Sequence, residues 1–93
     1  MDSAAILSAA SNQAIVQVPG RRFPGSVIQG DSLSHLYTVA CEIEDRVQAA
    51  TDEELRDLAV ELRELLEERL RHYDEILERS GIARPYASPQ WRS

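Results

Sequence analysis

The chain has 93 residues, 16 acidic and 10 basic side chains, and a formal net charge of −6. Its length suits one domain rather than two, and its 43% hydrophobic and 28% charged content is typical of a globular protein. No apolar run approaches the roughly 20 residues that cross a bilayer, so we expect no membrane partner, and the acidic balance argues against a nucleic-acid partner.

Acidic and basic residues are distributed unevenly along the chain. Residues 1–41 carry two of each, residues 42–78 carry fourteen acids against five arginines, and residues 79–93 carry three arginines and no acid. All ten basic residues are arginine, which excludes lysine-based chemistry such as Schiff-base formation or a phosphate-binding P-loop lysine. The sequence therefore has a neutral front, an acidic middle and a short basic tail.

Three short strands are predicted in the front part of the chain, over residues 4–10, 13–18 and 26–29. Isoleucine and valine are concentrated in the second and third of these segments, and β-branched side chains favour strands. Ser11-Asn12 predicts a tight turn after the first strand, and a loop rich in proline and glycine follows the second. Because sequential strands usually lie side by side, we expect a three-stranded antiparallel meander.

A first helix is predicted over residues 32–50. Asp31 or Ser32 is expected to cap its start, because a short side-chain oxygen accepts hydrogen bonds from the free N–H groups of the first turn. Apolar side chains then recur at steps of three and four residues, which places them on one face of the helix. These residues are Leu33, Leu36, Tyr37, Ala40, Ile43 and Val47.

A second, longer helix is predicted over residues 52–80. Thr51 and Glu54 form a capping-box pattern at its start, and Gly81 followed by Ile82 predicts a left-handed Schellman cap at its end. Glutamate and arginine four residues apart, in this order, also favour a helix. These pairs are Glu67–Arg71 and Glu75–Arg79.

The second helix carries a stripe of leucines and other apolar side chains. A helix of this length spans about 40 Å, more than such a domain needs, so we expect part of the stripe to cover the sheet or the first helix and the rest to meet a second chain in a homodimer. Alternatively the whole stripe is intramolecular core, since Arg69 and His72 interrupt a strict heptad seam. The residues predicted for the dimer seam or the core are Leu55, Leu58, Leu62, Leu65, Leu66, Tyr73 and Ile76.

The sequence holds no catalytic, cofactor-binding or metal-binding constellation, so we do not expect an enzyme. His35 and His72 have no metal-ligand spacing with Cys41. The single cysteine is expected to pack as a small apolar residue in a reducing compartment, and the N-terminus lacks the basic start of a secretory signal, so a cytoplasmic location is predicted. The many carboxylates of the second helix are expected to form a solvated face.

The loop between the second and third predicted strands is the first candidate partner-binding site. Arg21, Arg22 and Phe23 lie there between two Pro-Gly pairs, and arginine and aromatic residues dominate interface hot spots. Alternatively, Phe23 plugs the end of the sheet, and the two arginines are solvated or pair with acids of the second helix.

The C-terminal segment is the second candidate partner-binding site. Residues 82–93 contain two prolines and are expected to be extended, with Tyr86 and Trp91 outside the regular elements. Aromatic side chains in such a segment either dock on a partner or fold back over the apolar surface of their own domain.

Two resemblances to known families rest on these residues. The segments VPGRRFPGSVIQGDSL and GIARPY are similar to a family of small bacterial proteins that carry a domain of unknown function. Residues 14 to about 47, with a strand, a Pro-Gly loop, a Gln-Gly-Asp-Ser turn and a helix, resemble HicB-type antitoxins over a shorter range. The second resemblance implies a β-sheet with helices on one face and toxin neutralisation through protein binding. The long acidic helix stands where those antitoxins place a DNA-binding segment.

We therefore predict an α+β domain of order β-β-β-α-α over residues 1–81, followed by an extended tail. The expected function is that of a non-enzymatic protein-binding module, an antitoxin- or immunity-like inhibitor whose acidic helix masks a basic surface of its partner, because complementary charge speeds capture. The alternative function is a structural or adaptor subunit of a larger bacterial assembly, docking through the leucine stripe and the aromatic tail.

Overall fold

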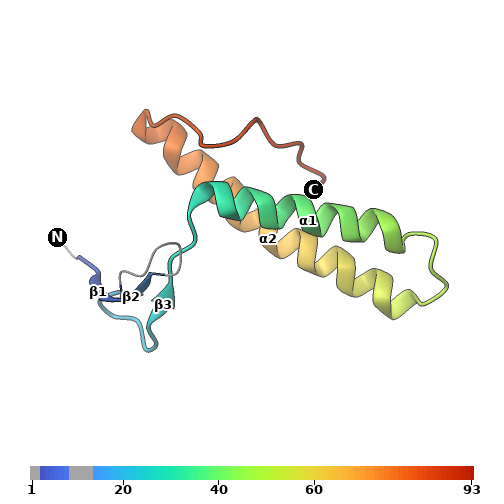
Figure 1. Ribbon diagram of the computed structural model, residues 1–93, viewed down its shortest axis with the longest axis horizontal. Coiled ribbons are helices and arrows are strands. Elements are labelled where there is room, and N and C mark those ends of the chain that lie inside the picture. The colour runs from blue at the N-terminus through green and yellow to red at the C-terminus, as the bar shows by residue number, and fades with distance from the viewer. Residues whose placement is uncertain (1–2, 9–13) are drawn as a thin grey trace.

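The computed structural model describes residues 3–8 and 14–93, and its elements follow the predicted order (Figure 1). Three strands precede two helices, and the second helix is the longer one, which confirms the α+β fold class. The elements are β1 (Ala5–Ser8), β2 (Ile15–Gln17), β3 (Gly25–Ser26), α1 (Gly30–Val47) and α2 (Glu53–Ser80).

The strands form one antiparallel sheet in the order β1-β2-β3, which is the topology of the predicted meander. Val16 of β2 pairs with Ile6 of β1 on one side and with Gly25 of β3 on the other, and a bulge interrupts the first ladder between Ile6 and Ser8. The turn predicted at Ser11-Asn12 lies outside the described residues.

The third strand is shorter than predicted and lies one residue earlier, ending at Ser26. The N–H of Val27 still donates to the carbonyl oxygen of Ala14 at 2.8 Å, so one further bond to the neighbouring chain follows the regular ladder. After that bond the chain leaves the sheet and enters α1 within three residues, because Gly30 already belongs to the helix.

α1 starts earlier than its predicted cap. Gln29 occupies the N-cap position without a side-chain cap bond, and Asp31 lies inside the first turn, where its carboxylate accepts from the N–H of Ser32 at 2.8 Å. The predicted cap at Asp31 or Ser32 is therefore wrong. Gly30 is buried in this first turn, and a Cβ atom there would overlap the ring of Tyr73, so glycine lets the turn lie close to α2 without moving that ring.

α2 confirms its predicted end and corrects its predicted start. Asp52, not Thr51, is the N-cap, and its side chain accepts from the N–H of Leu55 at 3.1 Å. At the other end Gly81 has φ +67°, and the N–H groups of Gly81 and Ile82 donate to the carbonyls of Glu78 and Leu77, which is the Schellman pattern.

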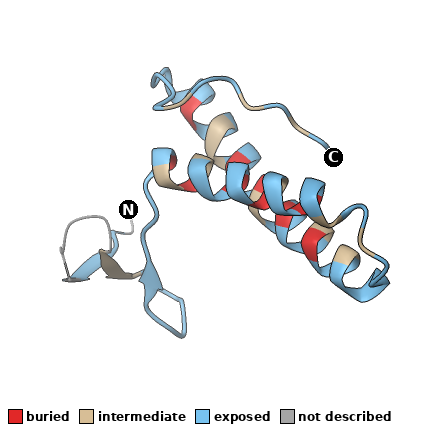
Figure 2. Cartoon of the chain, turned by 45° about the vertical axis from the view of Figure 1, so that its right-hand side comes forward, coloured by how far each residue is buried: buried red, intermediate tan, exposed pale blue. Residues whose placement is uncertain are grey.

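The two helices pack against each other as an antiparallel hairpin, and the sheet stands apart from them (Figure 1). No Cα atom of the described strands lies within 8 Å of a Cα atom of either helix. Figure 2 shows that the buried residues face one another between α1 and α2. The buried apolar residues are Leu33, Tyr37, Ala40, Ala59, Leu70 and Leu77.

Residues 82–93 form neither helix nor strand and run back along the hairpin towards the middle of α1 (Figure 1). Tyr86 and Trp91 are partly buried and pack against the cluster formed by Leu33, Tyr37 and Leu70. The tail therefore adds a third layer to the hairpin, on the side away from the sheet (Figure 1).

Candidate functional site

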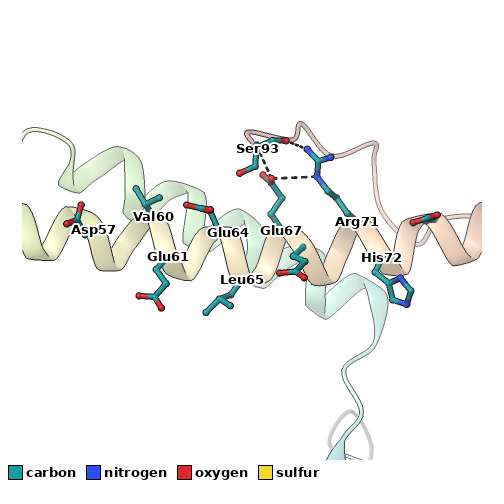
Figure 3. Close-up of a pocket in the computed structure, with 11 residues that line it drawn as sticks. Asp57, Val60, Glu61, Glu64, Leu65, Glu67, Arg71, His72 and Ser93 are labelled. Atoms are coloured by element: carbon teal, nitrogen blue, oxygen red, sulfur yellow. Dashed lines mark hydrogen bonds and ion pairs between the residues drawn. The ribbon is translucent and has the colours of Figure 1, made fainter.

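An open groove of about 720 Å³ runs along the outer side of α2 and reaches the end of the tail (Figure 3). Most of its lining side chains are acidic, and they recur at three- and four-residue steps, which keeps them on one side of a helix. These acids are Asp57, Glu61, Glu64, Glu67, Glu68 and Glu75. Arg71, His72 and Ser93 also line the groove. The groove therefore offers a concentrated negative surface.

Glu67 forms the floor of the groove where α2 meets the tail. It is 1% exposed, whereas the other acids of the groove are exposed. Its carboxylate accepts hydrogen bonds from the backbone N–H groups of Arg92 at 2.8 Å and Ser93 at 2.9 Å. Arg71 lies 3.6 Å away through its Nε, on the helical turn that follows. Figure 3 shows Glu67 and Arg71 both pointing towards Ser93.

The carboxylate of Glu67 is also bonded to α1. The hydroxyl of Tyr37 lies 3.0 Å from Glu67 Oε1 and 2.8 Å from the carbonyl oxygen of Gln90, so its single hydrogen serves two acceptors. Burial alone would raise the pKa of Glu67. The hydrogen bonds from Arg92, Tyr37 and Ser93 outweigh burial and hold that pKa below its ordinary value of 4.5, so the side chain is charged at neutral pH.

A buried arginine links the two helices beneath the tail. Arg63 of α2 is 7% exposed, and its guanidinium donates to Glu44 of α1 at 2.9 Å and to Glu67 at 3.4 Å. It also donates to the hydroxyl of Ser93 at 2.6 Å. Burial alone would lower the pKa of Arg63. The hydrogen bond to Glu44 and the charges of Glu44 and Glu67 outweigh burial and raise that pKa above its ordinary value, so the arginine stays charged. Every buried side-chain nitrogen and oxygen of the described residues has a hydrogen-bond partner.

The tail is held at its end by Trp91 and Arg92. The indole of Trp91 packs on Tyr37, with ring centroids 5.8 Å apart. The guanidinium of Arg71 lies over Trp91, 5.1 Å from the centroid of its ring. Arg92 donates to both carboxylate oxygens of Asp45, at 2.8 and 3.1 Å, and to Glu44 at 3.0 Å. The bonds from Arg92 lower the pKa of Asp45.

A second attachment holds the start of the tail against α2. Arg84 donates through two nitrogens to the carboxylate of Asp74, and the hydroxyl of Tyr86 donates to the same carboxylate at 2.9 Å. The ring of Tyr86 lies 6.4 Å from that of Tyr73. The bonds from Arg84 lower the pKa of Asp74, and burial, followed by the bond to Asp74, raises the pKa of Tyr86 to about 12.

Both aromatic residues predicted for partner binding in the tail therefore lie on the hairpin. Tyr86 and Trp91 contact helix residues of their own chain, and Leu66 and Tyr73 of the predicted stripe pack around the same buried cluster. Their placement corresponds to the alternative in which the tail folds back over the domain.

The predicted partner-binding loop lies on the opposite side of the molecule from the tail. Arg21, Arg22 and Phe23 are exposed between β2 and β3, and the guanidinium of Arg22 lies 5.3 Å from the centroid of the Phe23 ring. Phe23 is 71% exposed and does not plug the end of the sheet. Among the described residues neither arginine forms an ion pair with an acid of α2.

Most of the predicted leucine stripe is exposed rather than buried. Leu58 is 61% and Leu65 is 58% exposed, and Leu55, Leu62 and Ile76 are also exposed. The face of α2 that packs on α1 is a neighbouring one, centred on Ala59, Arg63, Leu70 and Leu77.

The remaining candidate groups are scattered. His35 and His72 are exposed, and Cys41 is half-buried beside the core cluster. Within residues 3–8 and 14–93 no group of three or more histidine, cysteine or acidic side chains is placed to hold a metal ion.

Sequence reasoning missed the buried ionic network. Glu67 was expected on a solvated face with the other carboxylates of the second helix, and neither Glu44 nor Arg63 was a candidate, because charged side chains are rarely buried. One signal was available: Arg63 and Glu67 fall at the three- and four-residue steps that connect Ala59 to Leu70, and Glu44 lies seven residues after Tyr37. Their spacing places them on the buried faces of the helices, whereas their charge is typical of exposed residues.

The fold and the groove define an α+β protein whose acidic helical hairpin is bound by its own C-terminal segment. A family model described as a family of unknown function (DUF6959) matches residues 1–86, and the chain belongs to this family. No curated protein and no solved structure matches the chain. Neither helix of the described part of the chain is long and apolar enough to cross a membrane.

Proposed function

We propose that the protein is a non-enzymatic protein-binding module that captures a partner with a basic surface through the acidic groove of α2. The observation that carries this proposal is the concentration of exposed carboxylates along one side of a single helix, from Asp57 to Glu75. Side chains on a rigid helix present charge without ordering a loop, and complementary charge raises association rates strongly.

An antitoxin- or immunity-like inhibitor is the specific form of this function that we propose. Its motivation is the small size and acidity of the chain, together with the likeness of residues 14 to about 47 to HicB-type antitoxins. In this form the groove covers a basic surface that a toxin needs for its own activity. A toxin gene beside the gene for this chain is the corresponding genomic expectation.

The test is affinity purification with the full chain from the cells that produce it, using two matched variants. The groove variant replaces Asp57→Asn, Glu64→Gln and Glu68→Gln, and the control replaces three exposed acids outside the groove. The control substitutions are Glu42→Gln, Glu53→Gln and Glu78→Gln. We expect the wild type and the control to retain the same basic protein and the groove variant to lose it.

The association rate with that captured protein provides the second measurement. Because the attraction is between exposed charges, the rate is expected to fall on the order of tenfold or more between low and high salt. A partner without a basic surface, equal retention by the groove variant, or a rate independent of salt would each contradict the proposed function.

The exposed apolar side chains favour a second candidate function, an adaptor subunit of a larger assembly. Leu58, Leu65 and Phe23 are each more than half exposed, and exposed apolar patches mark interaction sites. A neighbourhood of genes for a multi-component assembly, rather than one toxin gene, would favour this candidate.

A further inference from the structure

The sheet has no layer of its own chain to pack against. It contains strands of four, three and two residues, and none of their Cα atoms lies within 8 Å of a helix. Among the described strand residues, only Ser26 at the end of β3 faces α2, across an open cavity lined also by Tyr73 and Ile76. A sheet this small needs an apolar face packed on another element to be stable in water. Ile6 is 68% exposed and Phe23 is 71% exposed, so apolar surface of the sheet and its loop lies open.

The hairpin, like the sheet, exposes an apolar face. On α2 this face consists of Leu55, Leu58, Leu62, Leu65 and Ile76, at alternating steps of three and four residues apart from the gap at Arg69 and His72. On α1 it consists of Leu36, Val39 and Ile43. We call these eight side chains the apolar hairpin face.

Both halves of the apolar hairpin face lie on the side away from the tail. Residues advance about 100° around a helix, so Leu58 and Leu65 lie about a quarter-turn or more from the buried row, in the direction opposite to Glu67. Figure 3 shows Leu65 pointing away from the tail and Glu67 pointing towards it. In α1 Thr38 and Cys41 face the tail residues across a cavity, and Leu36, Val39 and Ile43 lie on the other flank.

We propose that a second copy of this chain covers the apolar hairpin face with its sheet, and that the exchange is reciprocal. Each sheet then packs on the hairpin of the other protomer, so one pair of contacts covers both open surfaces. Because each protomer gives a sheet and receives one, a two-fold axis relates the contacts and the assembly closes as a dimer. The sheet projects to one side of the hairpin in Figure 1, which leaves it free to reach a second molecule.

Charge identifies the second copy as the occupant and the sheet as its contacting part. Glu54, Glu61 and Glu68 follow one another at seven-residue steps directly beside the leucines of α2, and all three are exposed. Arg21 and Arg22 are exposed in the loop of the sheet. Docking the sheet on the hairpin places this basic loop beside the acidic row.

The competing dimer, in which two leucine stripes face each other, is less well supported. It brings the glutamate rows of two copies together, and like charges across an interface oppose association. It also leaves both sheets uncovered. The reciprocal exchange avoids both of these unfavourable features. It shares Glu61, Leu65 and Glu68 with the acidic groove, and the mass of the purified chain, measured without any partner, distinguishes it from partner capture.

The first experiment is sedimentation equilibrium on the full chain and two apolar variants. The wild type is expected at about twice the 10.4 kDa of one chain. The hairpin variant, Leu58→Asp with Leu65→Asp, and the sheet variant, Ile6→Asp with Phe23→Asp, are both expected at 10.4 kDa. A monomeric wild type would overturn the proposal, and so would a sheet variant that remains dimeric while the hairpin variant dissociates.

The second experiment mixes two charge variants. Arg21→Glu with Arg22→Glu places acid against acid in its own dimer, and Glu54→Arg with Glu61→Arg places base against base, so each alone is expected to be monomeric. An equimolar mixture pairs opposite charges at both contacts and is expected to recover the dimeric mass. Arg79→Glu, an exposed change beyond the last residue of the apolar hairpin face and outside both charged contacts, is the control and stays dimeric. A mixture that remains monomeric would refute the reciprocal exchange.

Discussion

Glu67 joins three segments of the chain through one carboxylate. It accepts from Tyr37 of α1, from Arg63 of its own helix and from the backbone of the tail at Arg92 and Ser93. A buried charge is tolerated only when donors replace the water it has lost. Apart from Arg63, the donors are 25 to 30 residues away in the sequence, so the cost of burial is offset only in the folded chain.

Glu67→Gln tests this residue directly. The amide keeps the shape of the side chain but removes the charge and turns one acceptor into a donor facing the N–H groups of the tail. We expect a loss of about 2 kcal/mol in the free energy of unfolding, because a buried charged donor, Arg63, loses an ionised partner. Urea unfolding followed by circular dichroism measures it.

Glu75→Gln is the matched control for that experiment. Glu75 pairs with Arg79 at 2.9 Å on an exposed surface, where an ion pair contributes below about 1 kcal/mol. Equal stability of the two variants would show that the Glu67 network does not support the fold.

The sequence identified some of the residues that hold the tail and missed others. Tyr86 and Trp91 were singled out by their chemistry, and the structure places both in contact with the hairpin. Glu67 was expected on a solvated face, because its chemistry is that of the exposed glutamates beside it and only its position on the row from Ala59 to Leu70 sets it apart. Its burial depends on the tail, which crosses α2 only after the chain has turned back.

At the scale of elements, α2 is delimited by local chemistry. Its C-terminal cap was predicted in full, because a left-handed glycine and the bonds across it involve residues within five positions. Its N-terminal cap was predicted one residue early, because Thr51 and Asp52 both carry a capping oxygen and the sequence alone does not choose between them. The aspartate takes the position.

Gly81→Ala is expected to destabilise the protein by about 1 kcal/mol, because an alanine at φ +67° pays the cost of the left-handed region. No heavy atom lies within 4 Å of the position a Cβ would take, so the loss reflects the backbone alone. Thermal unfolding by calorimetry measures it. Gly25→Ala, also in open space but without a positive φ, is the control and should leave the free energy of unfolding nearly unchanged. Equal losses for the two variants would contradict the backbone explanation.

The apolar stripe of α2 and the face that α1 covers are different sides of the helix. The leucines at Leu55, Leu58, Leu62 and Leu65 form the more regular stripe, yet the buried face includes Arg63 and Glu67. Hydrophobic periodicity identified the helix correctly but not the face that α1 covers, because paired charges occupy apolar positions on that face.

At the scale of the whole molecule, carboxylates of α1 and α2 hold the tail against the hairpin. Asp45, Glu67 and Asp74 each accept bonds from tail residues, and each has a pKa below its ordinary value. A depressed pKa in the folded state means that stability is complete above the ordinary values of 3.8 for the aspartates and 4.5 for Glu67. It is lost as the pH falls through the lower folded-state pKa values.

We therefore expect the tail to leave the hairpin in acid and to stay docked at neutral pH. Trp91, the single tryptophan, reports the change, and its fluorescence emission should shift to the red below about pH 4 as the indole leaves Tyr37 and Arg71. Arg92→Gln removes the bonds to Asp45 and Glu44 and should move the transition to higher pH. An emission spectrum independent of pH across this range would contradict the attachment of the tail by these carboxylates.

Local information in the sequence was enough for the order of strands and helices, the left-handed end of α2 and its glutamate–arginine pairs, because these depend on residues a few positions apart. Long-range contacts decided the rest: the burial of Glu44, Arg63 and Glu67, the docking of Trp91 and the separation of the sheet from the hairpin. Whether a charge is solvated or buried follows from which distant segment covers it. In this protein that segment is the tail, whose donors lie up to 48 residues from the carboxylates they reach.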